Sequence, residues 1–130
     1  MSEGWTIDRD PARAEPVRRI ALALDGVTER LSHGEATFFV GGRSFAMMAD
    51  HHHDDRVAVW LAAPPGLQET LVETAPDRFF RPPYVGGRGW LGVWLDVPVE
   101  DAELTRLVEQ AYATIAGTRP AGPTGRTRAS

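Results

Sequence analysis

Residues 76–90 read PDRFFRPPYVGGRGW, and this stretch is the most informative part of the chain for the fold. It combines arginine, proline, glycine and aromatic residues without a repeat, whereas core segments usually show a simple apolar period. Its prolines and its Gly86-Gly87 pair predict a loop, with a brief strand at Tyr84–Val85. The elements on either side of this loop define the rest of the fold.

The segment after the loop, residues 89–96, alternates as a β-strand does. Its two faces carry Leu91, Val93 and Leu95 on one side and Trp90, Gly92 and Trp94 on the other. If helices cover the leucine and valine face, both indoles project from the open face, and Gly92 leaves room for a flat partner. If the strand is turned over, the indoles form the core instead. The sequence leaves both arrangements open.

The segments before the loop predict two hairpins. Residues 36–40 and 43–48 flank Gly41-Gly42, a pair that can adopt the positive φ angles of a tight turn. Residues 47–50 and 56–62 form a second pair, in which 57–62 is apolar at every position. A strand that is apolar on both faces is expected at the centre of a sheet.

Three segments have helical apolar spacing. They are residues 15–24 with Pro16 in the first turn, residues 67–75, and residues 104–115. A short strand at 27–31 follows the first helix. The order α-β-β-β-β-α-(β)-β-α predicts an α+β protein with an antiparallel sheet and its helices packed on one face. We expect a single domain over residues 1–116 and a disordered tail over 117–130, which lacks core-forming residues.

The composition excludes several classes of protein. The chain has 130 residues, no cysteine, and a net charge of −4, so disulfide chemistry is excluded and a general nucleic-acid coat is disfavoured. It has neither a membrane-length apolar run nor a signal-like N-terminus, and we therefore expect a cytoplasmic protein, present as a monomer. All fourteen basic residues are arginine, which suits anion recognition but also follows from GC-rich coding.

Three motifs together resemble the MmcQ/YjbR family of small, mostly uncharacterised bacterial proteins with a CyaY-like fold. They are the Pro76–Trp90 stretch, Ser32–Phe38 and Trp90–Asp96, and the resemblance covers roughly residues 5–116. Ala36 departs from the family pattern, which usually has proline at that point. The resemblance implies the CyaY-like fold and a DNA-binding role through a double wing of hairpins. It does not imply the iron binding of frataxin relatives, because the first helix is dominated by Arg18 and Arg19 rather than by acids.

Our first hypothesis is therefore a non-enzymatic DNA-binding protein, with the Gly41-Gly42 hairpin and the Arg78–Arg88 loop as its two wings. The candidate nucleic-acid or anion-binding residues are Arg43, Arg78, Arg81, Tyr84, Arg88, Trp90, Trp94 and His33. Guanidinium groups suit phosphates and aromatic rings suit base stacking. One alternative is that these arginines pair with Asp77, Asp96 or Glu35 and bind no partner. A second is that the same surface binds a small anionic ligand or an acidic peptide in a concave site lined by Arg81, Tyr84, Trp90 and His33.

No motif indicates catalysis or a cofactor. Ser32 and His33 are adjacent, and neighbouring strand residues point to opposite faces, so they cannot form a nucleophile and base pair. His51–Asp55 offers imidazole and carboxylate ligands, but consecutive residues rarely converge on one ion, and we predict no dedicated metal site. We expect neither enzymatic activity nor a bound cofactor.

Overall fold

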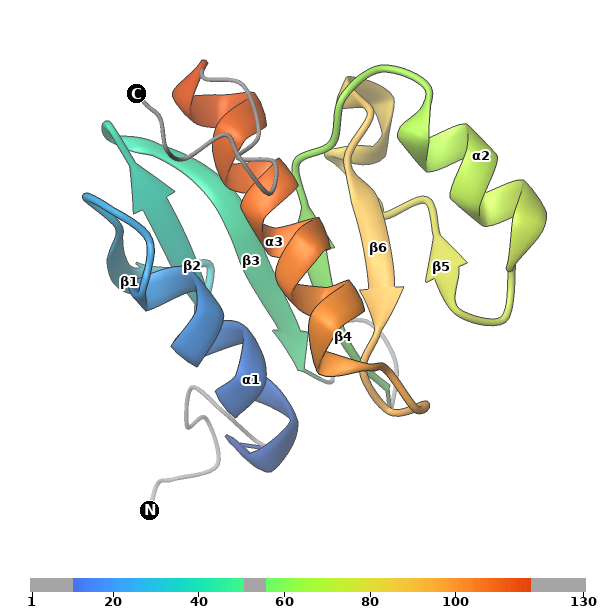
Figure 1. Cartoon of the computed structure of the whole chain (residues 1–130), viewed down its shortest axis with the longest axis horizontal. Coiled ribbons are helices and arrows are strands. Elements are labelled where there is room, and N and C mark those ends of the chain that lie inside the picture. Colours follow the sequence, from blue (N-terminus) through green and yellow to red (C-terminus); the bar gives the residue numbers. More distant parts are fainter. Residues whose placement is uncertain (1–10, 51–55, 118–130) are drawn as a thin grey trace.

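The computed structural model describes residues 11–50 and 56–117, which form one six-stranded antiparallel sheet and three α-helices (Figure 1). The helices are α1 (Pro11–Leu22), α2 (Leu67–Thr74) and α3 (Asp101–Ala116). The strands are β1 (Thr28–Ser32), β2 (Glu35–Val40), β3 (Arg43–Asp50), β4 (Val57–Leu61), β5 (Phe79–Phe80) and β6 (Leu91–Trp94). The α+β class and the order of elements are those predicted from the sequence.

The sheet has the strand order β1-β2-β3-β4-β6-β5, and every neighbouring pair is antiparallel. β4 lies between β3 and β6, and all five of its residues are buried. This confirms the prediction of a central strand from its apolar residues. The turn between β2 and β3 is Gly41-Gly42, and both glycines have positive φ, of 60° and 80°.

The core lies between the sheet and the helices, which cover one face of the sheet (Figure 1). Neighbouring strands contribute aligned rows of fully buried side chains to this face, as in the row Phe38, Ala46, Leu61 and Leu91. α3 runs across the sheet, where the ring of Tyr112 meets the edge of Phe45 at 5.7 Å between centroids. Phe45 reaches α3 although it adjoins Ala46 of this row, because the register between β2 and β3 shifts at this point. Away from this shift, residues that alternate with the rows point to the opposite face.

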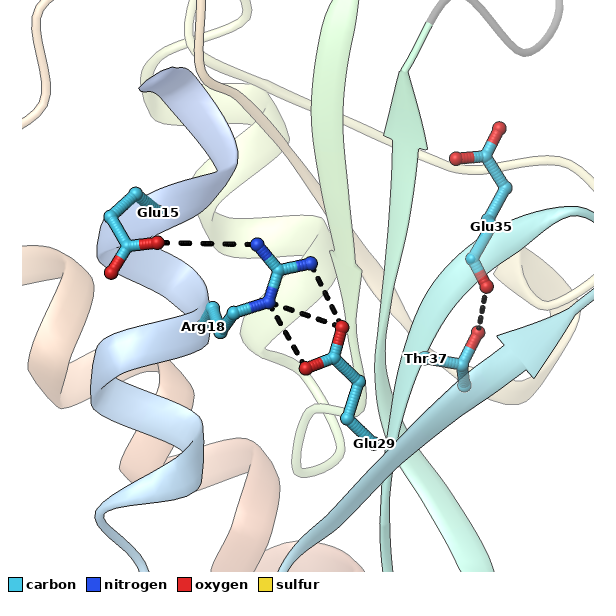
Figure 2. Close-up of polar contacts among 5 residues, drawn as sticks. All are labelled: Glu15, Arg18, Glu29, Glu35 and Thr37. Atoms are coloured by element: carbon cyan, nitrogen blue, oxygen red, sulfur yellow. Dashed lines mark hydrogen bonds and ion pairs between the residues drawn. The ribbon is translucent and has the colours of Figure 1, made fainter. Parts of the chain in front are cut away.

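An ion pair attaches α1 to the edge strand β1 (Figure 2). Arg18 Nε and Nη2 donate to the two carboxylate oxygens of Glu29 at 2.8–3.1 Å, and Arg18 also lies 4.0 Å from Glu15. A planar guanidinium and a carboxylate match each other in such a two-pronged contact. The contact marks Glu29, and hence its partner Phe38, as residues of the helix-covered face.

The face without helices also contains buried side chains. Met47, Trp60, Gly92 and Phe80 are successive partners across β3, β4, β6 and β5, and Trp60 is only 4% exposed. The segment between β5 and β6 reaches over this face, because Tyr84 and Val85 lie around the same pocket as Met47 and Trp60. We call the segment 81–90 the covering loop and the face beneath it the open face.

Two sequence predictions about local structure are wrong. Tyr84–Val85 is a turn rather than a strand, and the strand in this part of the chain is Phe79–Phe80, which pairs with β6. The positive φ of Tyr84, 66°, is incompatible with a strand. The first helix begins at Pro11, so Pro16 lies inside the helix and not in its first turn. Pro16 leaves the Ala12 carbonyl without its helical donor, and Ala12 is exposed to water.

Some predictions concern residues outside the described ranges. These are the His51–Asp55 loop and nearly all of the predicted tail, residues 118–130. None of the helices in the described residues is long and apolar enough to cross a membrane.

The ring of Phe80 lies against the backbone of β6 at Gly92. A Cβ atom at residue 92 would lie 2.3 Å from Phe80 Cζ, and the Phe80 ring also stacks on Trp94 at 4.1 Å between centroids. The room expected beside Gly92 for a flat partner is therefore occupied by the chain's own phenylalanine.

We predict that Gly92→Ala lowers the free energy of unfolding by about 1–3 kcal/mol, because the Phe80 ring has to leave its position. Gly87→Ala is the matched control, since a Cβ there meets only Arg81 Nη2 at 3.8 Å. Urea denaturation of both variants measures the effect. Equal stability of Gly92→Ala and the parent protein would contradict the packing described.

Candidate binding pocket on the open face

A pocket of about 370 Å³ lies on the open face of the sheet, under the covering loop. Within the described residues, five from four parts of the chain line it: His33, Met47, Trp60, Tyr84 and Val85. Its strand residues, Met47 of β3 and Trp60 of β4, are direct partners across the two strands. A thioether and an indole therefore form an apolar floor, while His33 and Tyr84 contribute the polar groups.

His33 reaches the pocket from the two-residue turn between β1 and β2. The turn consists of His33 with φ 54° and Gly34 with φ 80°, flanked by the pair Ser32 and Glu35. Turns of this kind require positive φ at both central residues, and the first position is usually asparagine, aspartate or glycine. Histidine is a more costly choice at this position, and it places an exposed imidazole at the pocket.

Tyr84 and Val85 reach the pocket from the covering loop. Tyr84 is 78% exposed and has φ 66°, although it is neither glycine nor asparagine. Among the described residues, His33 and Tyr84 are the two non-glycine residues with positive φ. Both of them line this one pocket.

The side chain of Gln68 in α2 holds the covering loop by hydrogen bonds to its backbone. Its side chain is 3% exposed, and Nε2 donates to the carbonyl oxygens of Gly86 at 2.9 Å and Trp90 at 2.6 Å. These carbonyls bracket the 3₁₀ turn Gly86–Arg88, which is further closed by N–H donation from Arg88 and Trp90 to the Val85 carbonyl. A helix residue therefore sets the position of the pocket wall.

Arg81 packs along the loop instead of pointing away from it. A Cβ at Gly86 would lie 2.7 Å from Arg81 Cγ, so the arginine stem occupies the space over this glycine. Arg81 Nη1 lies 3.5 Å from Gln68 Oε1, a long hydrogen bond. Glycine at 86 is thus required for close approach.

The other candidate arginines each contact a different part of the chain. Arg78 forms an ion pair with Glu103 of α3, and Arg43 donates to the carbonyl of Ile115 at 3.2 Å near the end of α3. Arg88 is exposed and lies 5.7 Å from the Trp90 ring centroid. The pairing of an arginine with an internal acid was an alternative that the sequence left open, but the partner of Arg78 is Glu103 and not Asp77, Asp96 or Glu35.

The two indoles do not form an exposed platform. Trp90 is 3% exposed, so the arrangement in which both indoles project from the open face, one of the two that the sequence left open, does not occur. Trp94 does lie on the face opposite Val93, as the alternation predicts, but it is partly buried between contacts with Phe80 and with Arg56, whose guanidinium carbon lies 3.7 Å from its ring.

The structure therefore brings only His33 and Tyr84 of the candidate residues into one pocket. Sequence reasoning missed Met47, Trp60 and Val85. The sequence signal for Met47 and Trp60 was their position on apolar strands, but such a position is equally typical of core residues. In the described ranges 11–50 and 56–117, no group of three or more His, Cys, Asp or Glu residues is placed to hold a metal ion.

Asp96 holds Arg56 over Trp94. Its carboxylate accepts from Arg56 Nε and Nη2 at 3.1 and 2.8 Å and from the Val57 N–H at 3.4 Å. The hydrogen bond from Arg56, helped by the backbone of Val57 and opposed by partial burial, holds the pKa of Asp96 below 3.8, the ordinary value for aspartate.

A lowered carboxyl pKa contributes stability above the unfolded-state pKa and loses it as the pH falls through the folded-state pKa. We predict that the free energy of unfolding falls below about pH 4 and that Asp96→Asn removes part of this acid dependence. Urea denaturation from pH 2.5 to 7 measures it, with Asp25→Asn as an exposed control. Identical acid limbs for the parent and Asp96→Asn would exclude the proposed linkage.

Comparisons with known proteins agree with this architecture. A family model described as YjbR matches residues 22–114, and the chain belongs to this family. The sequence resemblance to the MmcQ/YjbR family is thereby confirmed. No curated protein matches the chain.

One similar solved structure is the crystal structure of the Deinococcus radiodurans protein DR2400, described with a DUF419 family-model domain. It is 16% identical, the match covers 99% of this chain and 87% of that chain, and the TM-score is 0.68. At this identity the likeness shows the fold alone.

Proposed function

We propose that this protein is a small-ligand-binding module, not an enzyme, and that the open-face pocket is its binding site. The observation that carries the proposal is the coincidence of strain and concavity. His33 and Tyr84 are the two positive-φ non-glycine residues of the described chain, they come from separate segments, and both line the pocket.

Backbone strain of this kind has a cost that glycine would avoid. A non-glycine residue in a sparsely populated backbone region costs on the order of 1–3 kcal/mol, and such residues cluster at ligand sites. A two-residue turn would be satisfied by Asn-Gly, and a loop bend by glycine. The side chains of His33 and Tyr84 supply a reason for bearing the cost, because they provide the hydrogen-bonding groups of an otherwise apolar pocket.

The dimensions support a small molecule as the ligand. A volume of about 370 Å³ lies within the range of roughly 300–1,000 Å³ that is typical of small-molecule sites. Apolar walls with a few placed polar groups are also typical of such sites. The concave-site alternative drawn from the sequence named Arg81, Tyr84, Trp90 and His33, and two of these four residues line the pocket.

DNA binding, the first hypothesis from the sequence, is untested and has weaker support than ligand binding. A duplex is held by several cations facing one side, whereas Arg78 pairs with Glu103, Arg43 caps α3, and the net charge of the chain is −4. In a gel-shift titration with random duplex DNA, we expect no strong binding. The steep loss of affinity with rising salt that phosphate contacts produce should therefore not be seen.

A fragment screen by protein-observed NMR tests the ligand-binding proposal. We predict that several fragments shift the methyl signals of Met47 and Val85 in a saturable way, with millimolar or tighter dissociation constants. Tyr84→Gly should weaken this binding, because it removes the aromatic wall while tolerating positive φ. Leu31→Ala is the matched control, since it removes another exposed large apolar side chain away from the pocket.

A screen in which no fragment shifts the Met47 and Val85 methyl signals would overturn the proposal. Equal loss of binding in Tyr84→Gly and Leu31→Ala would do the same, because the effect would not belong to the pocket.

A further inference from the structure

We infer, on the basis of the proposed function, that the pocket selects a planar aromatic ligand with one anionic edge group, such as a bicyclic aromatic carboxylate. This preference follows from the kinds of side chain that line the pocket and from where its polar groups stand.

The apolar part of the lining favours an aromatic ring over a saturated one. Trp60 and Tyr84 each offer a π-face or ring edge, and aromatic pairs are favoured beyond the burial of their area. Met47 adds a polarisable thioether, which makes favourable contacts with aromatic rings. Three of the five lining residues thus interact better with a flat π-system than with an aliphatic group of the same volume.

The polar part of the lining favours a ligand with one polar edge. His33 is exposed in the β1–β2 turn, so its imidazole stands at the outer edge of the pocket, whereas Met47 and Trp60 lie on the strands. Among the five lining residues in the described part of the chain, His33 is the one with a basic side chain, although Tyr84 and Trp60 can also donate a hydrogen bond to an anion. An anionic group at the edge can therefore meet His33 while the ring lies on the strand residues.

The size of the pocket limits the ligand. At about 370 Å³ it is near the lower end of the usual range for ligand sites, so one or two fused rings fit better than a dinucleotide or a long acyl chain. Arg81 and Arg88 are not part of the lining, so a polyphosphate would lack the several cations that it needs.

The test compares naphthalene-2-carboxylate with trans-decalin-2-carboxylate, which has the same charge and a similar outline but no π-system. Dissociation constants come from NMR titration of the Met47 and Val85 methyl signals. We predict that the aromatic acid binds about two- to tenfold more tightly, the range that one favourable aromatic contact provides. Equal affinities, or tighter binding of the saturated acid, would overturn the inference while leaving the pocket a ligand site.

His33→Gly tests the polar edge, because glycine tolerates the turn and removes the imidazole. We predict that the variant binds naphthalene-2-carboxylate roughly two- to tenfold more weakly, as expected for one hydrogen bond, and that its affinity for the uncharged 2-naphthamide changes less. Thermal unfolding should show that the variant is folded. An equal change for both ligands, or no change for either, would refute the role of His33.

The outcomes separate the two proposals. If neither naphthalene-2-carboxylate nor any screened fragment shifts the pocket signals, the proposed function fails. If fragments bind without preference for aromatic acids, only the inference about ligand class fails.

Discussion

The structure depends on a sheet that buries side chains on both faces although its helices cover only one. Trp60 and Ala58 point away from the helices and are still 4% and 1% exposed. Burying such a row stabilises the protein by an amount that scales with its apolar area, so something other than a helix must exclude water there. The covering loop supplies part of that exclusion, and the pocket is the space that it leaves over Met47 and Trp60.

A loop can serve as a wall only if its own polar groups are satisfied and its position is fixed. Gln68 meets both needs, since its amide donates to two loop carbonyls while buried under the turn. An unsatisfied buried carbonyl costs about 1–3 kcal/mol, which explains why a polar side chain is present in the core at this point. Gly86 and Gly92 then allow Arg81 and Phe80 to lie against the backbone, which closes the loop onto the sheet.

Most of the helices and strands could be predicted from the sequence, whereas the residues that line the pocket could not. The alternation in β6, the apolar β4 and the Gly41-Gly42 turn each reflect local chemistry, and each appears in the structure as predicted. The pocket residues were harder to predict, because a tryptophan on a strand gives the same sequence pattern whether it lies in a core or on a pocket floor. Trp60 is such a case, and its pocket role depends on a loop that lies far from it in sequence.

The arginines show the converse error. Arg78 and Arg81 are close in sequence to Arg88 and suggested one basic surface, but side chains three to ten residues apart in an irregular loop need not point the same way. Arg78 turns to Glu103 of α3 and Arg81 runs along Gly86, so arginines that are neighbours in the sequence have different partners in the structure. His33 lines the same pocket as Tyr84 and Val85 of this loop, and the turn with positive φ that holds it there is visible only in the backbone angles.

The central claim, that Gln68 holds the covering loop as the wall of the pocket, is tested most directly by native-state hydrogen exchange of Gln68→Leu. This replacement keeps a good helix former of similar size at this position and removes both donations to the loop. The account predicts faster exchange at the Arg88, Gly89 and Trp90 amides, by about 1–3 kcal/mol of opening free energy, with the β2–β4 amides unchanged. Unchanged exchange in the loop, or equal acceleration throughout the sheet, would contradict it.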